Sequence, residues 1–237
     1  MSATDPRETA IRFLLATRLE DAYEVERLRR ELAGVNKEQL SRALADDRSR
    51  LAFWIDLYNA AVQQQPHYDF TDWNARLRFF RRPVLTIAGQ AVSLDDIEHG
   101  ILRRSRLKLG LGYVTNPLPS RFERRFRVGT VDARIHFALN CAAASCPPIA
   151  AYRTEQLDEQ LDLATRGYLR SSVSRGHDGI AVPAVLLWFI GDFGGPPGMR
   201  RFLRDHGIDG WGDRVRFTRW DWTPAPGRWA PERDPTL

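Results

Sequence analysis

A loop with two cysteines is the part of the sequence best suited to chemistry. It reads NCAAASCPP over residues 140–148 and follows a strand-like segment. A strand that runs into a tight turn and a short helix exposes the residue at the junction and directs backbone N–H groups toward it. If Asn140 caps such a turn, Cys141 takes its first position, where the helix dipole and free amides lower a thiol pKa and can bind an oxyanion. We therefore expect Cys141 to be a nucleophile.

The second cysteine of this loop, Cys146, is the weaker candidate. Pro147 and Pro148 have no N–H, so fewer donors follow it. Three other interpretations stay open: two small buried hydrophobes, a disulfide across the loop, or a metal site shared with His99 or His136. The chain has no Cys-x-x-Cys or His-x-x-x-His motif, no phosphate-binding glycine loop and no Gly-x-Ser-x-Gly elbow. We therefore expect neither a metal nor a cofactor.

The histidine expected to activate the thiol lies in a predicted helix over residues 94–104, which Ser93 caps. At the helical repeat, Glu98 falls inside the apolar face of this helix, and His99 lies at the edge of that face. A carboxylate on the core side is costly unless it is paired or hydrogen-bonded. Glu98 therefore either orients a catalytic group or forms a buried ion pair with one of the arginines.

Polar residues in two other apolar segments are candidates for the same site. The predicted helix over residues 49–64 is apolar nearly all round, so Asp56, Tyr58 and Asn59 need partners, either in a site or in a neighbouring loop. Residues 134–139 alternate as a strand does. This strand would place His136 on the face opposite its apolar side chains, where a structural role is the simpler interpretation.

Caps and hydrophobic periodicity predict the other elements. They are a long helix over 6–33, a helix over 36–44, a hairpin over 83–93, a loop over 109–125, a helix over 154–169, a short helix over 199–205 and a strand over 214–218. No linker or repeat divides the chain. We expect an α+β fold, a single domain over residues 51–237 with a small, mainly antiparallel sheet surrounded by helices. Residues 1–50, with the long N-terminal helix, would be an extension packed on this domain.

Composition excludes disorder as the overall state and gives the chain an unusual charge. It has 237 residues, 43% of them hydrophobic, and a formal charge of +5. Lys37 and Lys108 are the only lysines, so the basic residues are almost all arginines, and residues 76–127 carry a local surplus of them. This segment has no nucleic-acid-binding motif, so we do not expect a nucleic-acid partner. The lack of a signal-like N-terminus and of a long apolar run predicts a cytoplasmic protein without membrane contact.

Four segments resemble successive blocks of one protein family. They are AFWIDLYNA (52–60), SLDDIEHGILR (93–103), RIHFALNCAAASCPPI (134–149) and, more weakly, LWFIGDFG (187–194). In this order they are similar to the domain of unknown function 547, DUF547, which also occurs at the C-terminal end of plant leucine-zipper proteins of the ternary complex factor type. The resemblance spans about residues 51–194, and it implies no settled activity.

The same resemblance bears on single residues. It implies that the cysteine at Cys141 and the histidine at His99 persist among bacterial and plant members, whereas the positions of Cys146 and His136 vary. It also implies a glycine where this chain has Ala142, and an asparagine where it has Asp56. The resemblance therefore agrees with the choice of Cys141 as the nucleophile.

The expected function is a cysteine-dependent acyl-transfer enzyme: an amidase, a peptidase-like hydrolase or an amide-forming transferase. Cys141 would be the nucleophile and His99 the general base, with Glu98 or Asp192 orienting the imidazole. The residues expected to bind the substrate or its oxyanion are Asn59, Tyr58, Asn140, Ser145, Arg103 and His136. Because arginine binds carboxylates and phosphates bidentately, the expected partner is a small anionic molecule or peptide. The alternative is a non-catalytic binding module whose arginine-rich surface docks an anionic partner.

Overall fold

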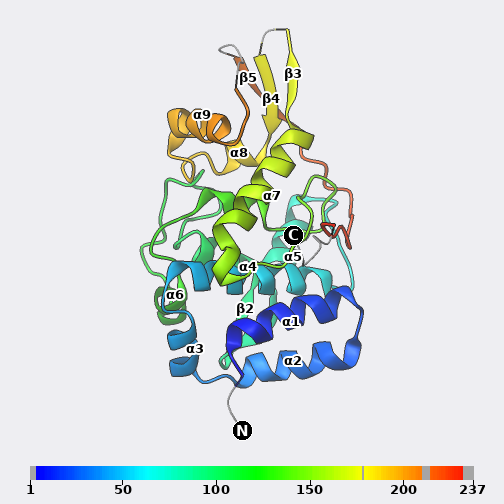
Figure 1. The fold of residues 1–237 in the computed structure, drawn as a ribbon, viewed down its shortest axis with the longest axis vertical. Coiled ribbons are helices and arrows are strands. Elements are labelled where there is room, and N and C mark those ends of the chain that lie inside the picture. Colours follow the sequence, from blue (N-terminus) through cyan, green and yellow to red (C-terminus); the bar gives the residue numbers. More distant parts are fainter. Residues whose placement is uncertain (1–3, 178, 210–213, 232–237) are drawn as a thin grey trace.

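The computed structural model describes residues 4–177, 179–209 and 214–231, and it shows an α+β fold, as the sequence predicts (Figure 1). The elements are α1 (Pro6–Arg18), α2 (Ala22–Gly34), α3 (Lys37–Ala43), α4 (Asp47–Gln63), α5 (Trp73–Arg81), β1 (Pro83–Ile87), β2 (Gln90–Ser93), η1 (Asp96–Leu102), α6 (Arg121–Phe126), η2 (Ala133–Phe137), η3 (Thr154–Gln156), α7 (Leu157–Ser172), β3 (Ser174–Gly176), β4 (Gly179–Pro183), α8 (Val185–Trp188), α9 (Gly195–Asp205) and β5 (Arg214–Thr218). Strands β1 and β2 form an antiparallel hairpin, and β4 pairs antiparallel with β3 and parallel with β5. Among the helices of the described chain, none combines the length and the apolar composition needed to span a bilayer.

Helix α4 is the centre of the fold. It begins two residues earlier than predicted because Asp46 accepts a hydrogen bond from the Ser49 amide and caps the first turn. Every residue from 51 to 62 is buried, as its all-round apolar pattern predicts. Helices α1 and η1 both pack against it. The polar side chains Asp56, Tyr58 and Asn59 therefore lie inside the protein, as expected.

The prediction of one long N-terminal helix is wrong, because the chain turns back between α1 and α2 (Figure 1). Glu20 takes the left-handed conformation with φ of 57°, and Asp21 caps α2 by accepting a hydrogen bond from the Glu24 amide. The apolar spacing misled the prediction because it continues across the turn. Two helices lying side by side can each bury part of the same stripe.

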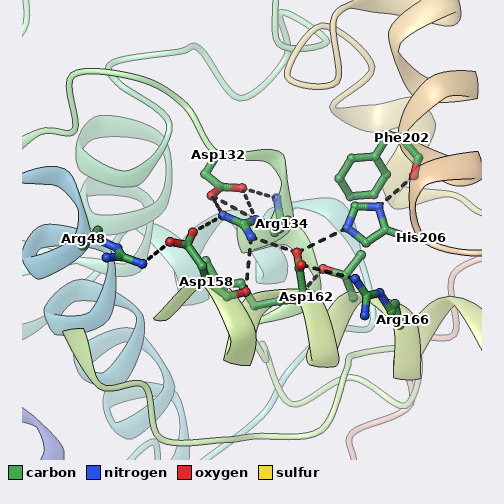
Figure 2. Close-up of polar contacts among 10 residues, drawn as sticks. Arg48, Asp132, Arg134, Asp158, Asp162, Arg166, Phe202 and His206 are labelled. Atoms are coloured by element: carbon green, nitrogen blue, oxygen red, sulfur yellow. Dashed lines mark hydrogen bonds and ion pairs between the residues drawn. The ribbon is translucent and has the colours of Figure 1, made fainter. Parts of the chain in front are cut away.

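The predicted strand over 134–139 is also wrong: residues Ala133–Phe137 form the 3-10 helix η2. Asp132 caps it by accepting a hydrogen bond from the Arg134 amide. The Arg134 guanidinium bonds the carboxylates of Asp132, Asp158 and Asp162, the last two on α7 (Figure 2). These contacts with another element fix the tight turn, and a short alternating pattern does not reveal them.

Two other segments differ from their predictions. Residues 96–102 form a π-helix, η1, in which the Arg103 amide donates to the Glu98 carbonyl and the Ser105 amide to the Gly100 carbonyl. The loop predicted over 109–125 contains the start of α6, whose Ser120 and Glu123 form a capping box. The π-turn matters for the site, because π-bulges often occur at functional positions and η1 carries both Glu98 and His99.

Candidate functional site

Most of the predicted reactive side chains meet at one cavity of about 320 Å³. Its polar lining includes both cysteines, His99, His136, Glu98 and Tyr58. The rest of the wall is largely apolar and aromatic: Trp73, Leu77, Phe80, Leu109, Leu111, Leu139, Val185, Trp188, Phe189, Trp220 and Trp222. A concave apolar pocket with a few converging polar groups is the usual form of a small-molecule site.

The cysteine loop does not begin with the predicted helical turn: residues 139–141 have no regular structure, and the loop is held by two buried amides. The Asn59 side chain accepts from the Asn140 amide and donates to the Ala138 carbonyl. The Asn140 side chain accepts from the Ala142 amide and donates to the Pro147 carbonyl. Neither asparagine lines the cavity. Both side chains are thus occupied in shaping the loop, and this arrangement does not favour the expectation that Asn59 and Asn140 bind an oxyanion.

The same loop bends at Ala142, which has φ of 65° and is fully buried. This conformation costs an L-residue more than it costs glycine. It explains why the family resemblance implies glycine at this position. The predicted substrate residue Ser145 lies outside the cavity lining. Its hydroxyl and carbonyl bind the Asp221 amide and the Tyr168 hydroxyl, so it also serves the loop.

The two thiols form a contact that we call the cysteine pair, Cys141 and Cys146. Their sulfur atoms lie 2.9 Å apart, and the Cys141 amide also donates to the Cys146 sulfur. Cys141 is partly exposed and Cys146 is buried. The Cys141 amide therefore points to the buried sulfur of Cys146, whereas the Ala143 amide interacts with both sulfurs.

This geometry moves the two thiol pKa values in opposite directions. The hydrogen bond to Cys146 and then burial raise the pKa of Cys141 well above its usual value. Burial alone would also raise the pKa of Cys146. Hydrogen bonds from the Cys141 thiol and from the amides of Cys141 and Ala143 outweigh burial, however, and lower that pKa. The cysteine pair thus titrates as a unit that shares one proton, with the first negative charge centred on Cys146.

His136 is the imidazole that a carboxylate orients. Its Nε2 lies 2.8 Å from the fully buried carboxylate of Asp192, and its ring stacks on Phe189 with 4.1 Å between centroids. Because an ionised carboxylate only accepts hydrogen bonds, the proton of neutral His136 sits on Nε2, and Nδ1 is the nitrogen with the basic lone pair. Burial lowers the pKa of His136, and the hydrogen bond that His136 donates to Asp192 partly offsets this effect.

Asp192 is itself held ionised by its neighbours. Two guanidinium nitrogens of Arg103 contact it at 2.6 and 3.1 Å, and Arg106 contacts it at 2.6 Å. Burial acts to raise the pKa of Asp192, but the bonds from His136 and Arg103 prevail and hold the pKa below its usual range. Arg103 is fully buried and does not line the cavity. It therefore positions Asp192, whereas the sequence predicts that it binds the substrate.

His99 lines the cavity in a different state. Arg103 donates to its Nδ1 across 2.7 Å. Because arginine is only a donor, Nδ1 is an acceptor and the imidazole proton lies on Nε2. Burial and the charge of Arg103 hold the pKa of His99 well below its usual value. A neutral imidazole whose acceptor nitrogen is occupied is a hydrogen-bond donor, so this geometry does not favour the expected base role.

Glu98 bonds to Tyr58, whose hydroxyl donates to it at 3.3 Å. Its carboxylate approaches the His99 ring no closer than 3.9 Å, which is too long for a hydrogen bond. Burial raises the pKa of Glu98, and nearby Arg103 and Lys108 offset only part of this rise. Glu98 is therefore a buried acid facing the cavity. Within the described ranges, no three acidic, histidine or cysteine side chains are grouped as metal ligands would be.

The aromatic wall is the part of the site that the sequence prediction missed. Trp188, Trp220 and Trp222 contact one another, with centroids 5.3 to 6.1 Å apart, and all three line the cavity. Two of them come from the segment after β5, and the tryptophans of RWDW (219–222) were the only signal. Arg76 and Lys108 are the cations of the lining, and the sequence prediction counted them only as part of the charge surplus.

Comparison with known proteins gives one match. A family model described as protein of unknown function, DUF547, matches residues 42–169. No curated protein and no solved structure matches the chain. The match includes the cysteine pair, His99 and His136, but it ends before Asp192 and the tryptophans of the cavity wall.

Proposed function

The chain belongs to the DUF547 family, whose function is unknown, and we propose from its own geometry that it is a cysteine-dependent acyl-transfer enzyme. One observation carries the proposal: a thiol pair and a carboxylate-oriented imidazole line the same small apolar cavity. A thiol nucleophile, a base and a group that orients the base are the recurring parts of such enzymes, whatever their order in the sequence.

Cys141 is the proposed nucleophile because it is the more exposed sulfur of the pair. His136 takes one proton from the cysteine pair at Nδ1, and Asp192 stabilises the resulting imidazolium. The remaining proton is shared across the 2.9 Å contact, and when it sits on Cys146, Cys141 is a thiolate. In this role His136 replaces His99 of the sequence prediction.

The Cys141 thiolate then attacks the carbonyl carbon of the substrate, and the carbonyl electron pair moves to oxygen. His99, with its proton on Nε2, is the proposed donor to this oxyanion. When the intermediate collapses, the leaving group takes the proton from His136, and the acyl group stays on Cys141 as a thioester. Water or an amine then removes the acyl group, with His136 again accepting a proton. The reducing cytoplasm is the proposed location because it would keep both thiols free.

The alternative of a docking module has less support in the contacts of the arginine-rich segment. Arg103 and Arg106 are both bound to Asp192, and Arg125 is bound to Glu38. Arg103 and Arg106 share the buried carboxylate of Asp192, so these two cations serve the interior of the fold and not a docking surface. A docking surface for an anionic partner needs cations that lack such partners.

Alkylation by iodoacetamide tests the proposed roles. We expect Cys141 to be modified before Cys146, and we expect His136→Gln to slow modification at about pH 6 by tenfold or more because the thiolate loses its base. His99→Gln is the matched control, since glutamine can still accept from Arg103, and it should leave the rate within about twofold. Equal rates in all three proteins, or a loss confined to His99→Gln, would contradict these roles.

A further inference from the structure

The cations around the cavity are not equivalent. Lys108 bonds to Asp95 at 2.8 Å. The guanidinium of Arg76, by contrast, has no carboxylate within ion-pair distance among the described residues. It donates to the Phe70 carbonyl at 3.3 Å, and it lies over the Trp222 ring at 4.9 Å. Arg76 is thus a positioned cation whose charge the described residues leave unmatched.

Two buried donors at the cavity wall also have no hydrogen-bond partner among the described residues. They are Nε of Arg76 and the indole Nε1 of Trp220, and both residues line the cavity. Buried N–H groups in folded proteins nearly always have a partner. An anionic ligand at this wall would match the charge of Arg76, and an acceptor group that reached either donor would give it the partner it lacks.

The rest of the cavity wall favours a ligand whose main part is apolar. On α5, Trp73, Arg76, Leu77 and Phe80 follow the spacing of one helix face, and all four line the cavity. Phe189 and the tryptophans also line the cavity, and their aromatic rings favour contact with aliphatic or aromatic groups of a ligand over contact with polar groups. At about 320 Å³ the cavity is at the small end of the range for ligand sites.

We propose that this cavity binds an amphiphilic carboxylate, with its aliphatic or aromatic body against the tryptophans and its carboxylate on Arg76 and Trp220. As a substrate, this ligand would carry, besides its carboxylate, the ester or amide carbonyl that Cys141 attacks, and in this respect the inference rests on the acyl-transfer function proposed above. It sharpens the expectation of a small anionic substrate and replaces Arg103, which is bound to Asp192, with Arg76 as the residue that selects the anion.

Binding of two matched probe pairs tests the inference without requiring any reaction. The pairs are decanoate with decan-1-ol, and 4-phenylbutyrate with 4-phenylbutan-1-ol. Binding of each probe is measured by the quenching of tryptophan fluorescence. The whole chain should bind the carboxylate of at least one pair about tenfold more tightly than its alcohol, because a charge-assisted hydrogen bond adds to the same apolar contact. Arg76→Gln should abolish that difference and leave alcohol binding unchanged.

Arg78→Gln is the matched control, because Arg78 lies on the same helix but does not line the cavity. It should retain the preference for the carboxylate, and thermal unfolding would check that both variants are folded. The inference is overturned if Arg76→Gln weakens acid and alcohol equally, if Arg78→Gln has the same effect, or if no carboxylate is preferred. If the preference follows Arg76 but Cys141 does not react, the binding site stands and the acyl-transfer function fails. If Cys141 reacts as proposed but no preference for the carboxylate is found, the acyl-transfer function stands and the proposed binding site fails.

Discussion

The buried carboxyl of Asp56 should make the stability of this protein depend on pH. Asp56 lies in the middle of α4 and is fully buried. One carboxyl oxygen accepts from the Tyr152 amide at 3.0 Å, and the other has no partner among the described residues. Burial raises its pKa well above the usual value, and the hydrogen bond from Tyr152 and the charge of Arg153 offset only part of this rise. The folded protein therefore keeps this carboxyl protonated where the unfolded chain ionises it.

The sign and size of the effect follow from linkage. Above the ordinary pKa of 3.8 and up to the raised pKa, unfolding releases a proton from Asp56, so the free energy of unfolding falls as pH rises. The slope from this one group is about 1.4 kcal/mol per pH unit. The stabilisation is complete below the ordinary pKa and is lost as pH rises through the raised one. Asp56→Asn keeps the acceptor for Tyr152 and cannot ionise, so it should remove this slope.

Urea unfolding, followed by tryptophan fluorescence from about pH 4 to pH 8, measures the difference between wild type and Asp56→Asn. We expect the variant to gain stability over wild type with rising pH. Asp69→Asn is the control: Asp69 is exposed, and bonds from the Thr71 hydroxyl and amide lower its pKa, so this variant should show no such gain. Parallel curves for wild type and Asp56→Asn would show that Asp56 is not protonated preferentially in the folded protein.

Three further predictions concern the fold and the thiols. In urea titrations, Arg134→Met should lower the free energy of unfolding by about 2 kcal/mol, because it leaves three carboxylates close together. Arg166→Met is the control: it removes one exposed ion pair and should change the free energy of unfolding by less than about 0.5 kcal/mol. Glu20→Gly should stabilise by about 0.5 kcal/mol because φ is positive there, while Glu26→Gly within α2 should destabilise by about 1 kcal/mol; thermal melts showing equal effects would argue against this turn. Mild oxidation by diamide should join the cysteine pair within one chain and block alkylation by iodoacetamide, and thiols that stay free would contradict the 2.9 Å contact.

Local signals in the sequence account for the parts of the fold that were predicted correctly. The hairpin of β1 and β2, helix α3 and the apolar helix α4 follow from caps, turn residues and periodicity. The turn at Glu20 and the 3-10 helix η2 were missed for another reason. Apolar spacing continues through the first, and contacts of Arg134 with α7 fix the second.

The site also contains residues that local sequence signals indicate and residues that only tertiary contacts reveal. Polar residues in apolar segments pointed to Cys141, Glu98, His99, Tyr58 and His136, and these side chains line one cavity because a buried polar group needs a partner or a site. The proposal of His136 as the base in place of His99 rests on contacts that Asp192 makes with residues far from it along the chain, and the sequence does not reveal these contacts. Residues that only complete a wall, such as Trp220, carry no pattern that reveals their place.

Formation of an acyl-enzyme is the decisive test of Cys141 as the nucleophile. The whole chain would be mixed with 4-nitrophenyl decanoate, quenched in acid after a short time, and measured by intact mass and by peptide mapping. We expect one decanoyl group on Cys141, absent in Cys141→Ser and formed at least about tenfold more slowly in His136→Gln. A chain that remains unmodified, or acylation that persists in Cys141→Ser, would contradict this role.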